Sequence, residues 1–350
     1  MTTLAEARAQ FVGGRRYLGA CSLGLATSST LEAMRADQAD WANGACSPAK
    51  YDAVIDRTRA SFARLMSVDA GRVAIGSQTS AMVSVLAAAV PAGREVLCVD
   101  GDFSSMVFPF VVAQVRGVVV RHVALEALAA SITPATHLVA FSLVQSSSGR
   151  VADVDAIVEA ARANGAFTLC DTTQAAGAMP VDASLFDATV CHAYKWLCAP
   201  RGAAFLTLAE GYQQTLAPLQ ANWYAGEDIW GSCYGPNMNL AVDARSFDVS
   251  PAWPVWVGAE PAIELFASLD LAEVHAHNVA LGDALCDGLG IPRRGQAIVT
   301  WPDADGRHLQ ALVAAGIVAS GRAGCARVAF HLWNDSRDVA DVLAALAAAH

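Results

Sequence analysis

Short apolar runs rich in β-branched residues alternate with longer alanine-rich amphipathic stretches through residues 72–208. The apolar runs, which predict strands, fall at residues 72–75, 95–99, 118–123, 137–143, 167–170, 188–191 and 203–208. The stretches that predict helices between them fall at residues 80–90, 105–116 and 154–164. A strand–helix–strand succession pairs its strands in parallel and covers both faces of the sheet with helices. The pattern therefore predicts an α/β fold around a mostly parallel sheet.

The pattern changes after about residue 209. Residues 216–256 are rich in Trp, Tyr, Gly, Asn and Pro and have no clear period. The helices expected beyond them cover residues 258–269, 271–289, 307–315 and 339–348, and the strands cover 297–301 and 327–331. We therefore expect two domains, a large one over residues 1–250 and a smaller C-terminal α/β domain over residues 251–350.

Charge and cysteine content narrow the functional classes. The formal net charge is −10 and no run of Lys or Arg is present, which argues against a nucleic-acid surface. The nine cysteines are scattered, and none forms a CxxC pair, which indicates reduced thiols and neither disulfides nor a metal site. We expect a cytoplasmic protein, because no apolar signal core and no apolar run of about 20 residues is present.

Asp171 and Lys195 carry the strongest chemical signal. Each follows a predicted buried strand, at 167–170 and 188–191 respectively. Ligands of open parallel sheets bind at the carboxyl ends of the strands, so we expect both side chains at one edge. The alternatives are a helix N-cap for Asp171 and a solvated surface lysine for Lys195. The neighbours Tyr194 and Trp196 make the surface alternative less favourable, since a solvated amine fits poorly among aromatic rings.

Pyridoxal 5′-phosphate (PLP) chemistry needs this pair of residue types. A lysine amine condenses with the PLP aldehyde as a Schiff base, and the substrate amine later displaces it. A carboxylate beside the pyridine nitrogen keeps that nitrogen protonated, which makes the ring a better electron sink. The sequence therefore predicts PLP as the cofactor, with Lys195 and Asp171 as the catalytic residues.

Asp171-Thr-Thr-Gln174 and Tyr194-Lys195 resemble motifs of the class V aminotransferases of PLP fold type I. That group includes cysteine desulfurases, kynureninases and isopenicillin N epimerase-like proteins, and the similarity runs over roughly residues 15–345. It implies a large domain with a mostly parallel seven-stranded sheet and a smaller C-terminal domain. It also implies that Asp171 meets the pyridine nitrogen, Gln174 lies near the ring hydroxyl and Tyr194 contacts the phosphate. His192 falls where relatives often carry a phosphate-binding serine.

Other cofactor contacts follow from the same resemblance. Gln78 and Thr79 stand in a turn that opens a predicted helix, where free N–H groups favour a phosphate. Phe103 matches the aromatic residue that stacks on the ring, and core packing is its alternative role. Ser146 stands where relatives often carry Asn. Ser250 matches a segment that reaches the neighbouring subunit's phosphate site, which implies a homodimer with sites at the interface.

The substrate side is predicted from two regions. An arginine fork pairs both oxygens of an α-carboxylate, and Arg327 resembles the family arginine that does so, with Arg322 as the second candidate. A surface arginine is the alternative for either residue. Trp223 and Tyr224 lie in an aromatic and polar stretch that lines a substrate pocket or, alternatively, a dimer interface.

The reaction type stays open among several that begin at Cα of a small amino-acid substrate. Cys325 lies only two residues before Arg327, which leaves no room for the flexible lobe of a cysteine desulfurase. We favour an aminotransferase, with a β-lyase (C–S or kynureninase-like) or an epimerase as alternatives. A catalytically silent PLP-fold binding protein is the non-enzyme alternative, and intact Asp171, Gln174 and Lys195 argue against it.

Overall fold

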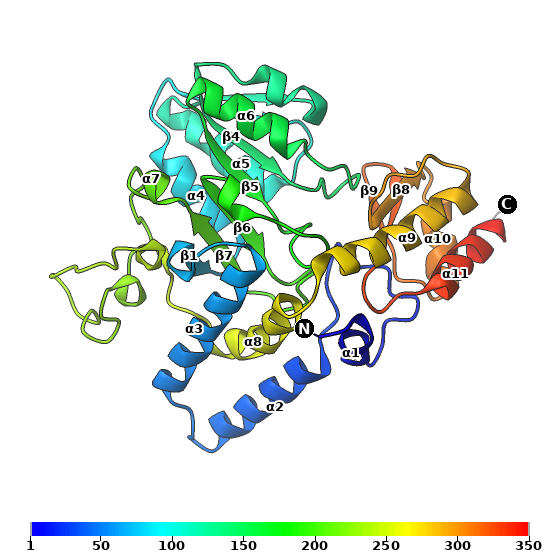
Figure 1. The fold of residues 1–350 in the computed structure, drawn as a ribbon, viewed down its shortest axis with the longest axis horizontal. Coiled ribbons are helices and arrows are strands. Elements are labelled where there is room, and N and C mark those ends of the chain that lie inside the picture. The colour runs from blue at the N-terminus through cyan, green and yellow to red at the C-terminus, as the bar shows by residue number, and fades with distance from the viewer. Residues whose placement is uncertain (1, 349–350) are drawn as a thin grey trace.

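A seven-stranded sheet forms the centre of the computed structural model, which describes residues 2–348 (Figure 1). Its strand order is β1-β7-β6-β5-β4-β2-β3. The strands are β1 (Val73–Gly76), β2 (Glu95–Val99), β3 (Val119–Val123), β4 (Thr136–Ser142), β5 (Phe167–Asp171), β6 (Ala188–His192) and β7 (Ala204–Leu208). Only β7 runs against the others, because it pairs antiparallel with both β1 and β6. The expected α/β fold with a mostly parallel sheet is confirmed, and six strands end at one edge.

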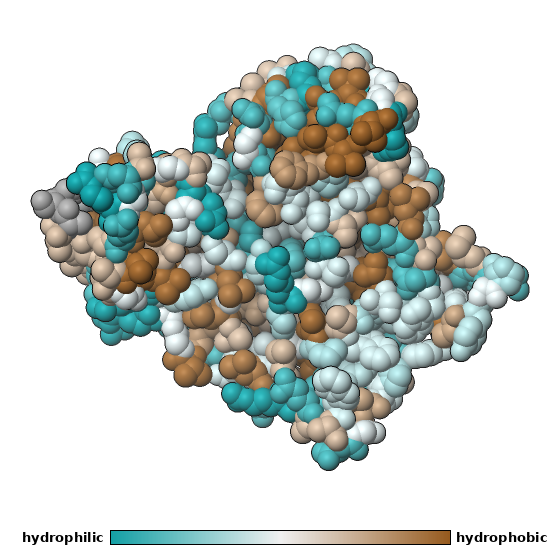
Figure 2. All heavy atoms as spheres, turned by 180° about the vertical axis from the view of Figure 1, so that it is seen from behind, coloured by the Kyte–Doolittle hydropathy of each residue, from teal (hydrophilic) through white to brown (hydrophobic). Residues whose placement is uncertain are grey.

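Helices cover both faces of this sheet. The helices α4 (Thr79–Ala89) and α5 (Ser104–Ala113) pack with one set of strand residues. The helices α3 (Pro48–Leu65), α6 (Val154–Asn164) and α8 (Trp253–Ala267) pack with the alternate residues of the same strands. Figure 2 shows the molecule from behind, with apolar side chains gathered at its upper end. Exposed apolar residues of α5 and the turn after it include Phe108, Val112 and Val115.

Capping residues and a proline explain where the expected helix bounds agree with the structure and where they differ. The helix expected at 154–164 has those bounds, because Asp153 accepts a hydrogen bond from Ala156 N–H and Gly165 is left-handed at φ 67°. Helix α8 begins five residues before the expected 258, because Pro254 stands in its first turn, where proline is favoured.

Three N-terminal helices were not predicted. They are α1 (Leu4–Ala9), α2 (Ser28–Ala42) and α3. Helix α2 buries only Thr30 and Asp37, so it has no apolar stripe that a periodicity could reveal. Together α2, α3 and α8 pack along one another beneath the sheet (Figure 1).

A second, smaller sheet lies in the C-terminal part. Its order is β8-β10-β9, with antiparallel pairing throughout. The elements are β8 (Ile298–Pro302), β9 (Ser320–Arg322), β10 (Cys325–Ala329), α9 (Leu271–Leu289), α10 (Arg307–Ala314) and α11 (Ser336–Ala347). The strand expected at 327–331 is β10 and begins two residues earlier, and β9 was not predicted. The boundary near residue 250 stays a prediction.

The remaining short elements are one helical turn and several 3₁₀ turns. Helix α7 (Glu210–Gln213) follows β7, and an extended arm over residues 226–240 projects from the large part (Figure 1). Within residues 2–348, no helix combines the length and the apolar character that crossing a membrane requires.

Candidate active site

The carboxyl edge of the large sheet brings the predicted cofactor residues to one cavity. The loops after β1, β2, β5 and β6 all contribute to its lining. The lining residues are Gln78, Thr79, Ser80, Phe103, Ser105, Asp171, Thr173, His192, Tyr194, Lys195 and Arg201. Seven residues predicted from the sequence as cofactor ligands therefore meet here, although β1 and β2 lie on opposite sides of β5 in the sheet.

Lys195 lies three residues beyond the end of β6 and is 5% exposed. Burial lowers the pKa of its amine, since the charged form loses solvation, and the negative charge of Asp171 opposes that shift. Its Nζ atom lies 5.2 Å from the ring centroid of Phe103. A lysine whose pKa is lowered holds more of the neutral, nucleophilic amine at physiological pH.

Asp171 is the last residue of β5 and is buried. Its Oδ1 accepts a 2.8 Å hydrogen bond from the N–H of Thr173. Burial raises the pKa of the carboxyl, while the Thr173 hydrogen bonds and the charge of Lys195 act in the opposite direction. A cationic ring nitrogen placed beside this carboxylate would favour its ionised form.

Phe103 is positioned by the carboxylate of Asp102, a residue whose role was not predicted. Oδ1 of Asp102 accepts from the Phe103 N–H at 2.6 Å and from the Ser142 hydroxyl at 2.6 Å. Oδ2 accepts from the Ser142 N–H at 2.8 Å and from Gln145 Nε2 at 3.1 Å. These contacts hold the loop after β2 against the end of β4, so the Phe103 ring faces the cavity on a fixed backbone.

The N-terminus of α4 forms the anion-binding end of the cavity. Gln78 is the N-cap, and its side chain makes no capping hydrogen bond to the first turn. The N–H groups at this end, with the hydroxyls of Thr79 and Ser80, therefore suit a phosphate. His192 is the last residue of β6 and Tyr194 lies in the loop after it, with ring centroids 4.3 Å apart.

His192 is neutral at physiological pH. Burial lowers its pKa to about 4, and the charges of Arg201 and Lys195 add to the shift. Its Nε2 lies 3.4 Å from the Gly202 N–H, which donates to it. His192 can therefore contact a phosphate through a neutral ring.

The side chain of Gln174 forms hydrogen bonds with three other segments of the chain near Lys195. Its Oε1 accepts a 2.8 Å hydrogen bond from Trp196 Nε1. Its Nε2 donates to the carbonyl of Cys21 at 2.9 Å and to the Ser146 hydroxyl at 3.2 Å. Ser146 thus lies beside Gln174, as expected, although neither residue lines the cavity itself.

Arg327 lies on β10, is 1% exposed and reaches the same group of residues. Its Nη1 donates to the backbone carbonyl and to the hydroxyl of Ser146, its Nη2 donates to Ser22 Oγ at 2.9 Å, and its Nε donates to Ser320 Oγ at 3.1 Å. Within residues 2–348 no carboxylate forms an ion pair with it. Burial lowers the pKa of Arg327, and the charge of the exposed Arg322 adds to that effect.

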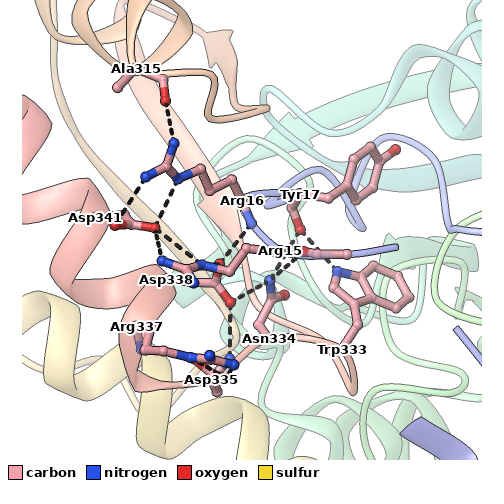
Figure 3. Close-up of polar contacts among 11 residues, drawn as sticks. Arg15, Arg16, Tyr17, Ala315, Trp333, Asn334, Asp335, Arg337, Asp338 and Asp341 are labelled. Atoms are coloured by element: carbon pink, nitrogen blue, oxygen red, sulfur yellow. Dashed lines mark hydrogen bonds and ion pairs between the residues drawn. The ribbon is translucent and has the colours of Figure 1, made fainter. Parts of the chain in front are cut away.

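The N-terminal segment is anchored to the small sheet and α11 (Figure 3). Arg15 and Arg16 both pair with Asp341, at 2.6 and 2.9 Å. The Tyr17 carbonyl accepts from Trp333 Nε1 at 2.9 Å. From there the chain passes Ser22 and reaches the lysine loop, so this segment joins the small sheet to the site.

Gly24 is the residue of the N-terminal segment that contacts the loop of Lys195. Its N–H donates a 2.8 Å hydrogen bond to the carbonyl of Tyr194. A Cβ atom at position 24 would lie 2.0 Å from the carbonyl oxygen of Lys195. Only glycine therefore permits this contact.

Four predicted residues lie away from the Lys195 cavity within one chain. Tyr224 donates from its hydroxyl to Asp52 at 3.1 Å, and Trp223 lines a separate hollow at the base of the 226–240 arm. Ser250 is exposed, and Arg322 is exposed on β9.

A larger hollow lies on the other side of the Ser147–Ser148 turn. It is lined by residues of both the large and the small part, among them Arg150, Arg294 and Cys325. It is lined by neither Lys195 nor Asp171, which both line the smaller cavity.

Comparisons with known proteins show the family of this chain. The family model for aminotransferase class-V matches residues 48–292. The chain is 28% identical over 257 residues to the isopenicillin N epimerase of Streptomyces clavuligerus, covering 66% of this chain and 63% of that protein. It is 29% identical over 254 residues to the kynureninase of Deinococcus radiodurans, covering 69% and 61%. The matches thus span about three fifths of these relatives' length.

Solved structures share the fold over nearly the whole chain. The cysteine desulfurase CsdA of Escherichia coli superposes with a TM-score of 0.86 at 17% identity, covering 100% of this chain and 98% of the other. The cystine C–S lyase C-DES superposes with a TM-score of 0.86 at 21% identity, covering 96% and 98%. At these identities the likeness shows PLP fold type I.

Proposed function

This chain belongs to the aminotransferase class-V family, and we propose that it transaminates a small α-amino acid with PLP bound at Lys195. The observation that carries the proposal is the meeting of Lys195 and Asp171 in one cavity at the carboxyl edge of the sheet. The family is PLP-dependent.

The donor set of the cavity fits PLP. Lys195 offers the amine that bonds to the cofactor aldehyde, and Asp171 offers the carboxylate for the ring nitrogen. Phe103 offers an aromatic face, and the first turn of α4 offers N–H groups and hydroxyls for the phosphate. When bound, PLP supplies an electron sink that stabilises negative charge at the substrate Cα.

Lys195 is the residue suited to move the substrate proton. Its buried amine has a lowered pKa, and its Nζ would take the Cα proton of the amino acid and return it. Among the described residues that line the cavity, His192 has a pKa of about 4 and Tyr194 has a raised pKa, so neither is a comparable base near neutral pH. A single base acting on one face of Cα would favour transamination over an epimerisation that uses two bases.

Arg327 would bind the substrate α-carboxylate. Its guanidinium is held by neutral hydroxyl and carbonyl groups, and its positive charge is left uncompensated by any carboxylate in residues 2–348. A buried cation of this kind favours an anionic ligand. The Gln174–Cys21 and Gly24–Tyr194 contacts would keep the N-terminal segment over the lysine and exclude water.

Epimerisation is the second candidate. It is favoured by the similarity to two isopenicillin N epimerases, of which the one from Amycolatopsis lactamdurans is 33% identical over 171 residues. A homodimer would be the active unit in either case, with Ser250 and the Trp223–Tyr224 stretch directed to the partner's site.

The cofactor assignment can be tested on a single residue, because the chain contains only two lysines, Lys50 and Lys195. Lys50 is exposed and pairs with Asp40, which makes it a matched control. The protein is incubated with PLP, reduced with borohydride and digested. The phosphopyridoxyl label should appear on the Lys195 peptide, persist in Lys50→Ala and disappear from that position in Lys195→Ala. Labelling of Lys50 alone would refute the assignment.

The reaction type is tested with amino acids in deuterated water, with and without an added keto acid. Transamination predicts one equivalent of keto-acid product without acceptor and many turnovers with it. Epimerisation predicts the opposite enantiomer with deuterium at Cα and no need for an acceptor. Sustained release of pyruvate, alanine or sulfide without acceptor would instead establish a lyase.

A further inference from the structure

Arg201 lines the Lys195 cavity, and its role was not predicted from the sequence. It stands in the turn that follows the lysine loop, directly before Gly202, whose N–H donates to His192. Its guanidinium carbon lies 4.9 Å from the ring centroid of Tyr194. Arg201 therefore belongs to the group of residues at the anion-binding end.

Arg201 has no carboxylate partner in the part of the chain that the structure describes. Within residues 2–348 it forms no ion pair with Asp or Glu, although it is exposed and fully charged. The carboxylate that lines the cavity, Asp171, is already opposed by the charge of Lys195. The neutral His192 ring does not add a positive charge.

A phosphate monoester carries a charge between −1.5 and about −2 at neutral pH. The N-terminus of α4 supplies partial positive charge and hydrogen-bond donors, but no full cation. A guanidinium beside that helix end would complete the charge balance and offer two parallel donors to phosphate oxygens.

We infer that Arg201 is a phosphate-binding residue, which pairs with the phosphate monoester of the cofactor beside the first turn of α4. The inference rests on the proposed function, since it takes PLP as the ligand. It adds a cation to Gln78, Thr79, His192 and Tyr194, the phosphate contacts predicted from the sequence within one chain. Tyr194 then acts partly by holding the guanidinium against its ring.

The test compares PLP with pyridoxal, which has the same ring and aldehyde but no phosphate. Cofactor-free full-length protein is titrated with each compound, and binding is followed by the visible absorbance that appears with the lysine adduct. The variants are Arg201→Gln and Arg201→Lys. Arg35→Gln is the matched control, because Arg35 is also exposed and without a carboxylate partner within residues 2–348 but lies on α2.

We expect Arg201→Gln to weaken PLP binding about tenfold or more and to leave pyridoxal binding unchanged. Arg201→Lys should show a smaller loss, since it keeps the charge but not the fork. Inorganic phosphate should compete with PLP in the wild type and compete less well in both variants. This competition in Arg201→Lys decides the question if Arg201→Gln does not fold.

Two results would overturn the inference. One is unchanged PLP binding in Arg201→Gln. The other is an equal loss for PLP and pyridoxal, which would place Arg201 at the ring. In both cases the wild type still binds PLP at Lys195, so the proposed function stands. A wild type that binds neither compound would refute the proposed function itself.

Discussion

Arg327 and Ser22 are joined by a 2.9 Å hydrogen bond from Nη2 to Oγ, although 305 residues separate them in sequence. The bond joins the central strand of the small sheet to the N-terminal segment. The same guanidinium contacts Ser146 at the edge of the large sheet. One buried side chain thus connects the N-terminal segment, the large sheet and the small sheet, and all of its partners in residues 2–348 are neutral.

Arg327→Lys should reduce kcat/KM for the amino-acid substrate about tenfold to a hundredfold. The lysine keeps the charge but loses the planar fork that pairs both carboxylate oxygens. The visible absorbance of bound PLP should be unchanged, because Arg327 does not line the cofactor cavity. Arg322→Lys serves as the control and should retain wild-type kinetics. The reverse ranking of the two variants would assign the carboxylate to Arg322.

Gly24→Ala should destabilise the protein by about 1–3 kcal/mol and weaken PLP binding. The added Cβ would lie 2.0 Å from the Lys195 carbonyl oxygen, and backbone cannot yield as a flexible side chain does. The N-terminal segment or the lysine loop must therefore move. Urea denaturation and PLP titration measure the two effects.

Gly13→Ala is the matched control for that substitution. In the part of the chain that the structure describes, no atom lies within 4 Å of the position a Cβ would take at Gly13, and neither glycine has a left-handed φ. Gly13→Ala should therefore leave both quantities unchanged. Equal behaviour of the two variants would show that the close approach of Gly24 to the lysine loop does not matter.

The sequence predicted the parts of the fold that rest on local signals. Strand β2 has the expected bounds 95–99, since it is a short apolar run buried between neighbours. The antiparallel direction of β7 was not predicted, because a doubly buried strand has the same composition in either direction.

The sequence predicted those residues of the candidate site that directly follow, or end, a strand of the central sheet. Lys195, Asp171 and Phe103 meet as expected, because parallel strands end at one edge. Asp102 and Arg201 were missed, because their partners are fixed by three-dimensional proximity and no spacing in the chain indicates them. The aspartate contacts Ser142 only because β2 and β4 are neighbours in the sheet.

Stability should fall as the pH is lowered from about 6.5 toward 4, through His331. This residue is fully buried, its Nε2 donates to the Trp196 carbonyl at 2.8 Å, and its Nδ1 has no hydrogen-bond partner among residues 2–348. Burial lowers its pKa to about 4. Between these pH values the unfolded chain binds a proton that the folded chain does not, so stability is complete above 6.5 and declines below it.

The difference between the unfolded-state and folded-state pKa of His331 corresponds to roughly 3 kcal/mol of folding stability. Denaturation with urea over this pH range should give a shallower decline in His331→Gln, which cannot titrate. The remaining decline belongs partly to His192, whose pKa is also lowered to about 4. Asp341, with a pKa of about 2, loses its contribution only at lower pH. Identical slopes in wild type and variant would rule out His331 as the cause.

Ser250 should act on the partner subunit's cofactor, and subunit mixing distinguishes this from a role in its own chain. Ser250 follows Asp248, whose carboxylate pairs with Arg59 at 2.7 Å and accepts from the Ile75 N–H at 2.7 Å. That buried pair fixes the segment against β1. Ser250→Ala should weaken PLP binding about tenfold through the lost hydrogen bond to a charged group.

The mixed dimer of Ser250→Ala and Lys195→Ala chains decides between the two roles. If Ser250 serves the partner's site, one of the two sites combines an intact Lys195 with an intact Ser250. That site should bind PLP with wild-type affinity at half the wild-type stoichiometry. If Ser250 serves its own chain, every site that retains Lys195 lacks the serine hydroxyl, and the mixed dimer should bind PLP no better than the Ser250→Ala homodimer.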